Sequence, residues 1–96
     1  MKVLTDKQKL ESMVQKGPLL QWLKQQDPDK RFKYDNCFEC CLAQYLKAQG
    51  YAAPHIGAHT ATVDSFGLNC SIPLDVAVAL YSVNYRQVIW KLEASA

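Results

Sequence analysis

The segment from Tyr34 to Tyr51 constrains the fold of this chain more than any other. Asn36 followed three positions later by Glu39 is a capping pattern, in which side chains satisfy the first backbone N–H groups of a helix. Gly50 supplies the left-handed residue that commonly ends one. The apolar residues between these signals recur at helical spacing and define one buried side: Phe38, Cys41, Leu42, Tyr45 and Leu46. We therefore predict a central helix over residues 37–49.

Two helices are predicted before this segment. Thr5 and Gln8 form a capping box, and the helix that they start should run to about Lys16. The pair Gly17-Pro18 ends that helix and permits another to begin. The second helix carries a short apolar patch made of Leu19, Leu20, Trp22 and Leu23.

Two more helices are predicted near the C-terminus. Proline suits a first helical position, so a helix is expected over 73–82, although its valines also permit a buried strand. Because most of its residues are apolar, we expect it to lie deep in the core. Asn84 with Gln87 gives a further capping pair. The helix after that pair has an apolar stripe at helical spacing, formed by Tyr85, Val88, Ile89 and Leu92.

Strands are predicted only in short segments. Residues 27–30, Asp-Pro-Asp-Lys, favour a turn. Alternation of aromatic and basic residues indicates a brief edge strand over 32–34, and alternation over 59–64 permits a second. The fold class that follows is α+β, predominantly α, with about five helices around the helix 37–49 and a small two-stranded element. A chain of 96 residues builds one core, so residues 1–96 are predicted to form a single globular domain.

Composition and hydropathy limit which cellular compartment and which classes of partner we expect for this chain. The chain is 49% hydrophobic and has a formal charge of +2, which gives no strong reason to prefer an acidic partner. No apolar run approaches the ~20 residues that span a bilayer, and the N-terminus turns polar before a signal-peptide core can form. We therefore expect a cytoplasmic protein with no membrane partner and no cofactor. In that reducing compartment the four cysteines are expected to be thiols.

A zinc site is the first chemical alternative. Cys37-x-x-Cys40 followed by His55-x-x-x-His59 has the spacing of a two-cysteine, two-histidine set. In a zinc finger, however, the cysteines lie on a hairpin and the histidines on a helix, whereas here the cysteines start a helix and the histidines follow it. Buried thiols and loop imidazoles are the favoured interpretation.

Thiol chemistry is the second alternative. Cys37, in the first turn of the predicted helix, is placed where the helix dipole favours a thiolate. The segment 35–46 is similar to the nucleophile helix of papain-like peptidases that process bacteriocin leaders, except that Phe38 replaces the family's glycine. A cysteine nucleophile also needs a base and an orienting residue, for which the chain offers His55 or His59 with Asp64 or Asn69. The motif Cys37-x-x-Cys40 also permits a redox switch, but a thioredoxin-type motif follows a strand in a βαβ unit. We favour a protein that is not an enzyme.

Nucleic-acid binding is possible but not favoured. Arg31 and Lys33 alternate with Phe32 and Tyr34, a basic and aromatic cluster that can contact phosphates and stack on a base. Aspartates flank the cluster on both sides, which is more typical of a solvated edge. The last two helices can imitate a helix-turn-helix, but the second of them carries few basic residues.

Protein binding is favoured instead. Tryptophan, tyrosine and arginine are enriched at interface hot spots. Trp90 lies off the apolar stripe of its helix, and Arg86 precedes it by about one turn. The predicted partner-binding residues are therefore Arg31, Lys33, Arg86 and Trp90.

A resemblance in the central segment indicates where such a protein comes from and which kind of protein it binds. Residues 36–51 read Asn-Cys-x-x-Cys-Cys-Leu-Ala-Gln-Tyr-Leu-Lys-Ala-x-Gly-Tyr, and this core resembles small uncharacterised proteins carried by bacteria and their phages or prophages. The resemblance implies a host-directed accessory or inhibitor protein, such as an anti-CRISPR. Such a protein would act by occluding a surface of a host or defence protein, for example a CRISPR effector.

Overall fold

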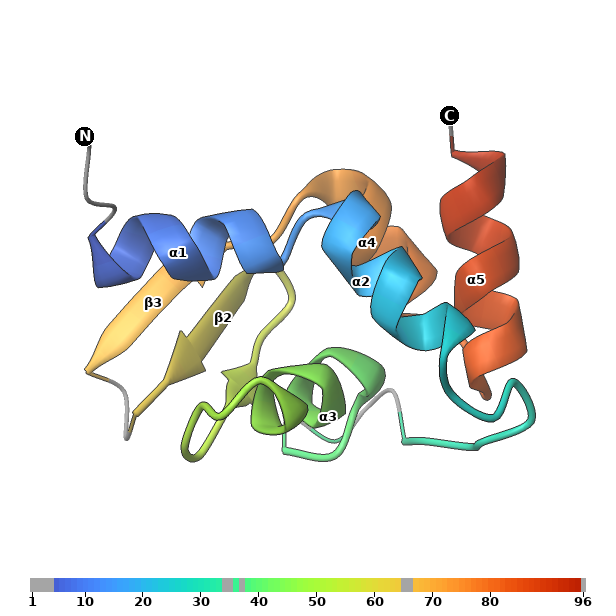
Figure 1. Ribbon diagram of the computed structural model, residues 1–96, viewed down its shortest axis with the longest axis horizontal. Coiled ribbons are helices and arrows are strands. Elements are labelled where there is room, and N and C mark those ends of the chain that lie inside the picture. The colour runs from blue at the N-terminus through green and yellow to red at the C-terminus, as the bar shows by residue number, and fades with distance from the viewer. Residues whose placement is uncertain (1–4, 34–35, 37, 65–66, 96) are drawn as a thin grey trace.

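The computed structural model describes residues 5–33, 36, 38–64 and 67–95. This part of the chain forms five helices and a three-stranded antiparallel sheet (Figure 1). In chain order the elements are α1 (Asp6–Met13), α2 (Lys16–Lys24), α3 (Cys41–Ala48), β1 (His55–Ile56), β2 (Thr60–Val63), β3 (Leu68–Ser71), α4 (Leu74–Ala79) and α5 (Tyr85–Ala94). The predicted α+β class with about five helices is confirmed, and the sheet has one strand more than expected.

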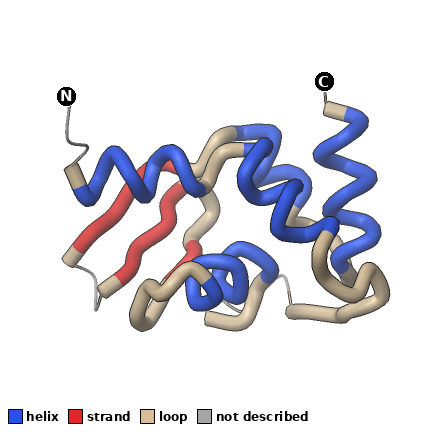
Figure 2. Tube along the Cα trace, viewed as in Figure 1, coloured by secondary structure: helices blue, strands red, loops and turns tan. Residues whose placement is uncertain are grey.

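The sheet and most of the helices occupy opposite ends of the molecule. The strands lie together at one end, whereas α2, α4 and α5 lie together at the other (Figure 2). Helix α1 packs on β3, α5 packs on both α2 and α4, and α3 contacts both α2 and β1. One cluster of buried apolar side chains runs through both ends, from Val63 in the sheet to Leu92 in α5.

The sheet is formed entirely by residues between 55 and 71. Its order is β1-β2-β3, with Ala61 opposite Cys70 on the buried face and Thr62 opposite Asn69 on the other. The prediction that 32–34 pairs with this sheet is wrong. Arg31 instead makes an isolated bridge with Asn84, and Phe32 is buried against Tyr85 with ring centroids 5.9 Å apart. Tyr34 lies outside the described residues.

Helix α3 begins at Cys41, four residues later than predicted. The Oδ1 atom of Asn36 accepts from the Phe38 N–H at 2.9 Å, and its carbonyl accepts from the Cys40 N–H at 3.1 Å. These two bonds form a separate turn that precedes the helix. They do not form the first turn of α3. Phe38 is consequently exposed, so its predicted burial is wrong. The remainder of the predicted side is buried, namely Cys41, Leu42, Tyr45 and Leu46.

The C-terminal end of α3 is as predicted. Gly50 has a φ of +96°, in the left-handed region. The Tyr51 N–H donates to the Leu46 carbonyl at 3.1 Å, and the Gly50 N–H donates to the Lys47 carbonyl at 3.0 Å. These two bonds make a Schellman motif, which pairs carbonyls that the last turn leaves open. The chain can therefore reverse from α3 directly into the sheet.

The other local start signals act as expected. Thr5 and Gln8 form the predicted capping box of α1, and the Asn84 side chain accepts from the Gln87 N–H at 3.0 Å. Helix α1 ends at Met13, earlier than predicted, because α2 already begins at Lys16. The predicted stripe on α5 is confirmed, since Tyr85, Val88 and Leu92 are buried and Ile89 is half-buried.

The prediction that α4 lies deep in the core is wrong. One side of the helix is buried through Val76, Ala77 and Ala79. Leu74 and Val78, on the other side, are 75% and 56% exposed. Helix α4 packs chiefly on α5, so only one of its sides is covered.

Replacing Gly50 tests the end of α3. We expect Gly50→Ala to lower the free energy of unfolding by about 1–2 kcal/mol, because a Cβ atom strains the left-handed conformation. No atom lies within 4 Å of the added Cβ, so the loss comes from the backbone alone. Gly50→Asn should lose less, since asparagine tolerates this region. Urea unfolding of the three proteins measures the difference, and equal stability of the alanine variant and the parent would contradict it.

Candidate protein-binding surface

The loop before residue 33 is fixed to the start of α5 by backbone bonds. The Lys30 N–H donates to the Asp27 carbonyl at 3.1 Å, which closes the predicted turn. The Tyr85 N–H then donates to the Lys30 carbonyl at 3.0 Å, and the Arg86 N–H donates to the Pro28 carbonyl at 2.8 Å. The first N–H groups of a helix have no partner within the helix. The loop supplies partners for two of them, and so lies against the N-terminal end of α5.

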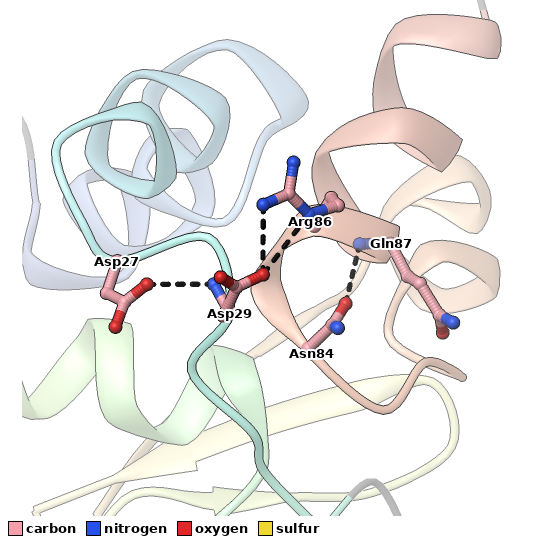
Figure 3. A network of polar contacts seen from close by, with 5 residues as sticks. All are labelled: Asp27, Asp29, Asn84, Arg86 and Gln87. Carbon is pink, nitrogen blue, oxygen red and sulfur yellow. Dashed lines mark hydrogen bonds and ion pairs between the residues drawn. The ribbon is translucent and has the colours of Figure 1, made fainter.

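An ion pair between Arg86 and Asp29 closes the same junction (Figure 3). The Nη2 and Nε atoms of Arg86 lie 2.9 and 3.3 Å from one carboxylate oxygen, Oδ1 of Asp29. Asp29 is itself oriented, because its N–H donates to the Asp27 side chain at 2.9 Å. Both charged side chains are exposed, and such pairs contribute only about 0–1 kcal/mol. The pair therefore orients the guanidinium at the surface more than it stabilises the fold.

Trp90 lies on the same side of α5 as Arg86. The two residues are four positions apart, so they are neighbours on the helix surface. Trp90 is 69% exposed, and the buried stripe faces away from it. Arg31 and Lys33 are also exposed, and the bridge from Arg31 to Asn84 places the loop beside the first turn of α5. We call the four exposed residues predicted to bind a partner the α5 surface: Arg31, Lys33, Arg86 and Trp90. Arg31 and Arg86 lie at the junction of the loop with α5, and Trp90 follows one turn later on the helix.

A second exposed apolar feature was missed from the sequence. Leu74, Val78 and Tyr81 follow the spacing i, i+4, i+7 and lie on the uncovered side of α4 and its continuation. Tyr81 is 59% exposed, and its carbonyl accepts from the Lys91 ammonium group of α5. We call these three residues the α4 strip. The spacing was visible in the sequence, but the expectation that α4 is buried on all sides concealed it.

Of the two aromatic residues in the basic loop, only Phe32 lies within the described residues. Phe32 is buried against Tyr85, so its ring does not face solvent. Arg86 is paired with Asp29, and Lys91 donates to a backbone carbonyl. In a helix-turn-helix protein, basic side chains of the second helix contact DNA phosphates. In α5, Arg86 and Lys91 instead contact groups of this protein.

The described cysteines are poorly suited to nucleophilic chemistry. Cys40, Cys41 and Cys70 are all buried. Burial raises the pKa of Cys41 far above its usual range, and the neighbouring Cys40 raises it further. Burial also raises the pKa of Cys70. A reactive cysteine needs the opposite shift, which keeps the thiolate populated.

The residues of the metal and catalytic alternatives are dispersed over several elements. The His55 ring packs edge-on against Phe38 at 5.1 Å, whereas His59 lies in the exposed turn before β2. Asp64 accepts from the Ala52 N–H at 3.4 Å, and Asn69 lies on the outer face of the sheet. Among the described residues, no three His, Cys, Asp or Glu side chains are grouped closely enough to hold a metal ion. Cys37, which both alternatives use, lies outside the described residues, so both remain predictions.

Comparisons with protein-family models, curated proteins and solved structures give no match to this chain. Within the described residues, no helix has the length and apolar character needed to cross a bilayer.

Alkylation of the Cys37→Ser protein tests the state of the three described thiols. At pH 8 in native buffer we expect iodoacetamide to modify Cys41 at least tenfold more slowly than in urea, because burial removes both access and thiolate. A raised pKa means that the thiolate appears only at higher pH, so native labelling of Cys70 should increase into the alkaline range. Peptide mass spectrometry measures each rate. Equal rates for native and unfolded Cys41 would contradict the burial described here.

Proposed function

We propose that this chain is a small non-enzymatic protein-binding accessory or inhibitor protein. The observation that carries the proposal is the exposure of large apolar side chains on the last two helices, in the α4 strip and at Trp90. Contiguous exposed apolar patches commonly mark interaction sites. In this proposal α3 is the central helix of the fold, which the burial of five of its eight residues supports.

The α4 strip supports a contact made by a helix face. Three apolar side chains at i, i+4, i+7 are the anchors with which a helix docks into an apolar groove. Val78 lies between Leu74 and Tyr81 on this face and is itself 56% exposed. A groove on the partner would bury the strip, while the opposite side of α4 stays in the core.

The α5 surface supports a second, more polar contact. Trp90 and Arg86 are of the residue types enriched at interface hot spots. Asp29 already orients the Arg86 guanidinium, so less side-chain entropy is lost when a partner binds. Arg31 and Lys33 add positive charge beside it, which favours a partner surface that carries carboxylates.

The proposed origin of the protein and the proposed identity of its partner rest on the sequence resemblance of residues 36–51. In this proposal the protein is derived from a phage or prophage and occludes a host or defence protein, such as a CRISPR effector. The burial of Cys40, Cys41 and Cys70, with the raised pKa values of Cys41 and Cys70, supports an action by surface complementarity rather than by thiol chemistry.

Affinity capture with surface variants tests the proposal. Tagged protein would be incubated with lysates of bacteria that carry an active CRISPR system, and captured proteins quantified by mass spectrometry. We expect Trp90→Ala and Val78→Glu each to reduce the specific captured protein at least tenfold, because each removes an apolar anchor. Arg31→Ala should reduce it less, as a charge at the rim does.

Phe38→Ala is the matched control, since it removes an exposed aromatic ring from outside both surfaces. It should capture the same protein as the parent, and circular dichroism would verify that every variant is folded. Capture that no variant changes, or that does not exceed the tag alone, would overturn the proposal.

A further inference from the structure

A shallow hollow of about 320 Å³ lies between α2, the end of α1 and α3. Trp22 of α2 forms its apolar wall together with Pro18 and Met13. Tyr45 of α3 also lines it, and its hydroxyl donates to the Met13 carbonyl at 3.0 Å. That bond links α1 to α3 and fixes the two sides of the hollow. None of these residues belongs to the α4 strip or the α5 surface.

Three glutamines complete the lining, and it carries no formal charge. Gln21 comes from α2, Gln25 follows α2 and Gln49 follows α3. All three residues are exposed, so their amide groups are open to solvent. An uncharged ligand suits this lining, and the glutamine amide N–H groups can donate to it.

The indole N–H of Trp22 is a fourth open donor. It makes no hydrogen bond to any described residue, yet no buried side-chain nitrogen or oxygen in the described part of the chain lacks a partner. The indole N–H of this half-buried residue is therefore accessible to solvent. The hollow combines an aromatic wall with donors that a ligand can reach.

We propose that this hollow binds a proline-rich peptide segment in the polyproline II conformation. Such a segment has no internal hydrogen bonds, and proline has no N–H, so its carbonyls need donors from outside. The glutamine amides and the Trp22 N–H are donors of this kind. Prolyl rings pack on aromatic side chains, and an open hollow accommodates an extended chain that enters on one side and leaves on the other. The preformed conformation keeps the entropic cost of binding low.

A stacked nucleobase is the competing occupant, since glutamine can pair with adenine and indole can stack on a base. The geometry favours the peptide. The Trp22 ring is tilted by 58° to Tyr45, the other aromatic ring of the lining, so the two rings form an angled wall rather than a parallel slot. An angled wall does not sandwich a base between two side chains, as the pockets of base-flipping enzymes do.

Tryptophan fluorescence provides a direct test, because the chain has only two tryptophans. In the Trp90→Phe protein, Trp22 is the sole reporter. We expect capped hexaproline to change its emission saturably, with a dissociation constant at least tenfold lower than that of a capped Gly-Ser hexapeptide. In the Trp22→Phe protein, the emission of Trp90 should not respond.

Glutamine variants locate the site without disturbing the core. In the Trp90→Phe background, Gln25→Ala and Gln49→Ala should each weaken hexaproline binding about two- to tenfold, the effect of one lost hydrogen bond. Gln87→Ala on α5 is the matched control and should leave it unchanged. Absence of saturable binding, equal binding of the Gly-Ser peptide, insensitivity to Gln25 and Gln49, or tighter binding of adenosine would each overturn the inference. None of these results bears on the α4 strip or the α5 surface, so this inference and the proposed function fail separately.

Discussion

The relative positions of the helices depend on a cluster of three aromatic rings from three different helices. Trp22 of α2 lies 5.4 Å from Tyr45 of α3 and 5.6 Å from Tyr85 of α5, measured between ring centroids. Both phenols are satisfied inside the protein, since Tyr45 donates to the Met13 carbonyl and Tyr85 donates to the Gln44 side chain. Burial raises the pKa of both tyrosines, which keeps the phenol protons available for these bonds. Tilted aromatic contacts contribute about 0.5–1.5 kcal/mol each beyond area burial. The cluster therefore combines apolar packing with hydrogen bonds that specify one arrangement.

The aromatic cluster contributes to the α5 surface and to the hollow beside α2. Because Tyr85 is drawn into the cluster, α5 faces inward at that residue and outward at Arg86 and, one turn later, at Trp90. The loop that pairs with the Tyr85 and Arg86 N–H groups lies against the start of this helix. Trp22, from the same cluster, also lines the hollow between α2 and α3. One set of packed rings thus contributes to both features.

Features that depend on neighbouring residues could be predicted from the sequence, and features that depend on distant ones could not. The capping pair of α5 and the end of α3 at Gly50 are local hydrogen-bond patterns, and both were predicted. The segment 32–34 has the alternation of a strand, but Phe32 is drawn to Tyr85, more than fifty residues away. Helical periodicity placed Trp90 beside the buried stripe of α5, which fits either the rim of the core or a contact surface, and only the structure shows that it is 69% exposed. The hollow was not predicted, because its walls are separated in the chain by more than twenty residues and meet only through the aromatic cluster.

The fold leaves most of the surface of Leu74 and Val78, in the α4 strip, uncovered, since they are 75% and 56% exposed. Helix α4 spans only Leu74–Ala79, and so short a helix depends on packing rather than on its own propensity. Its buried side supplies that packing, so polar residues at positions 74 and 78 would serve the core equally well. Glutamate or lysine there would also improve solubility and raise helix propensity, since valine is a poor helix former. Under the proposed function, the exposed apolar side chains at 74, 78 and 81 belong to a surface that becomes buried in a complex.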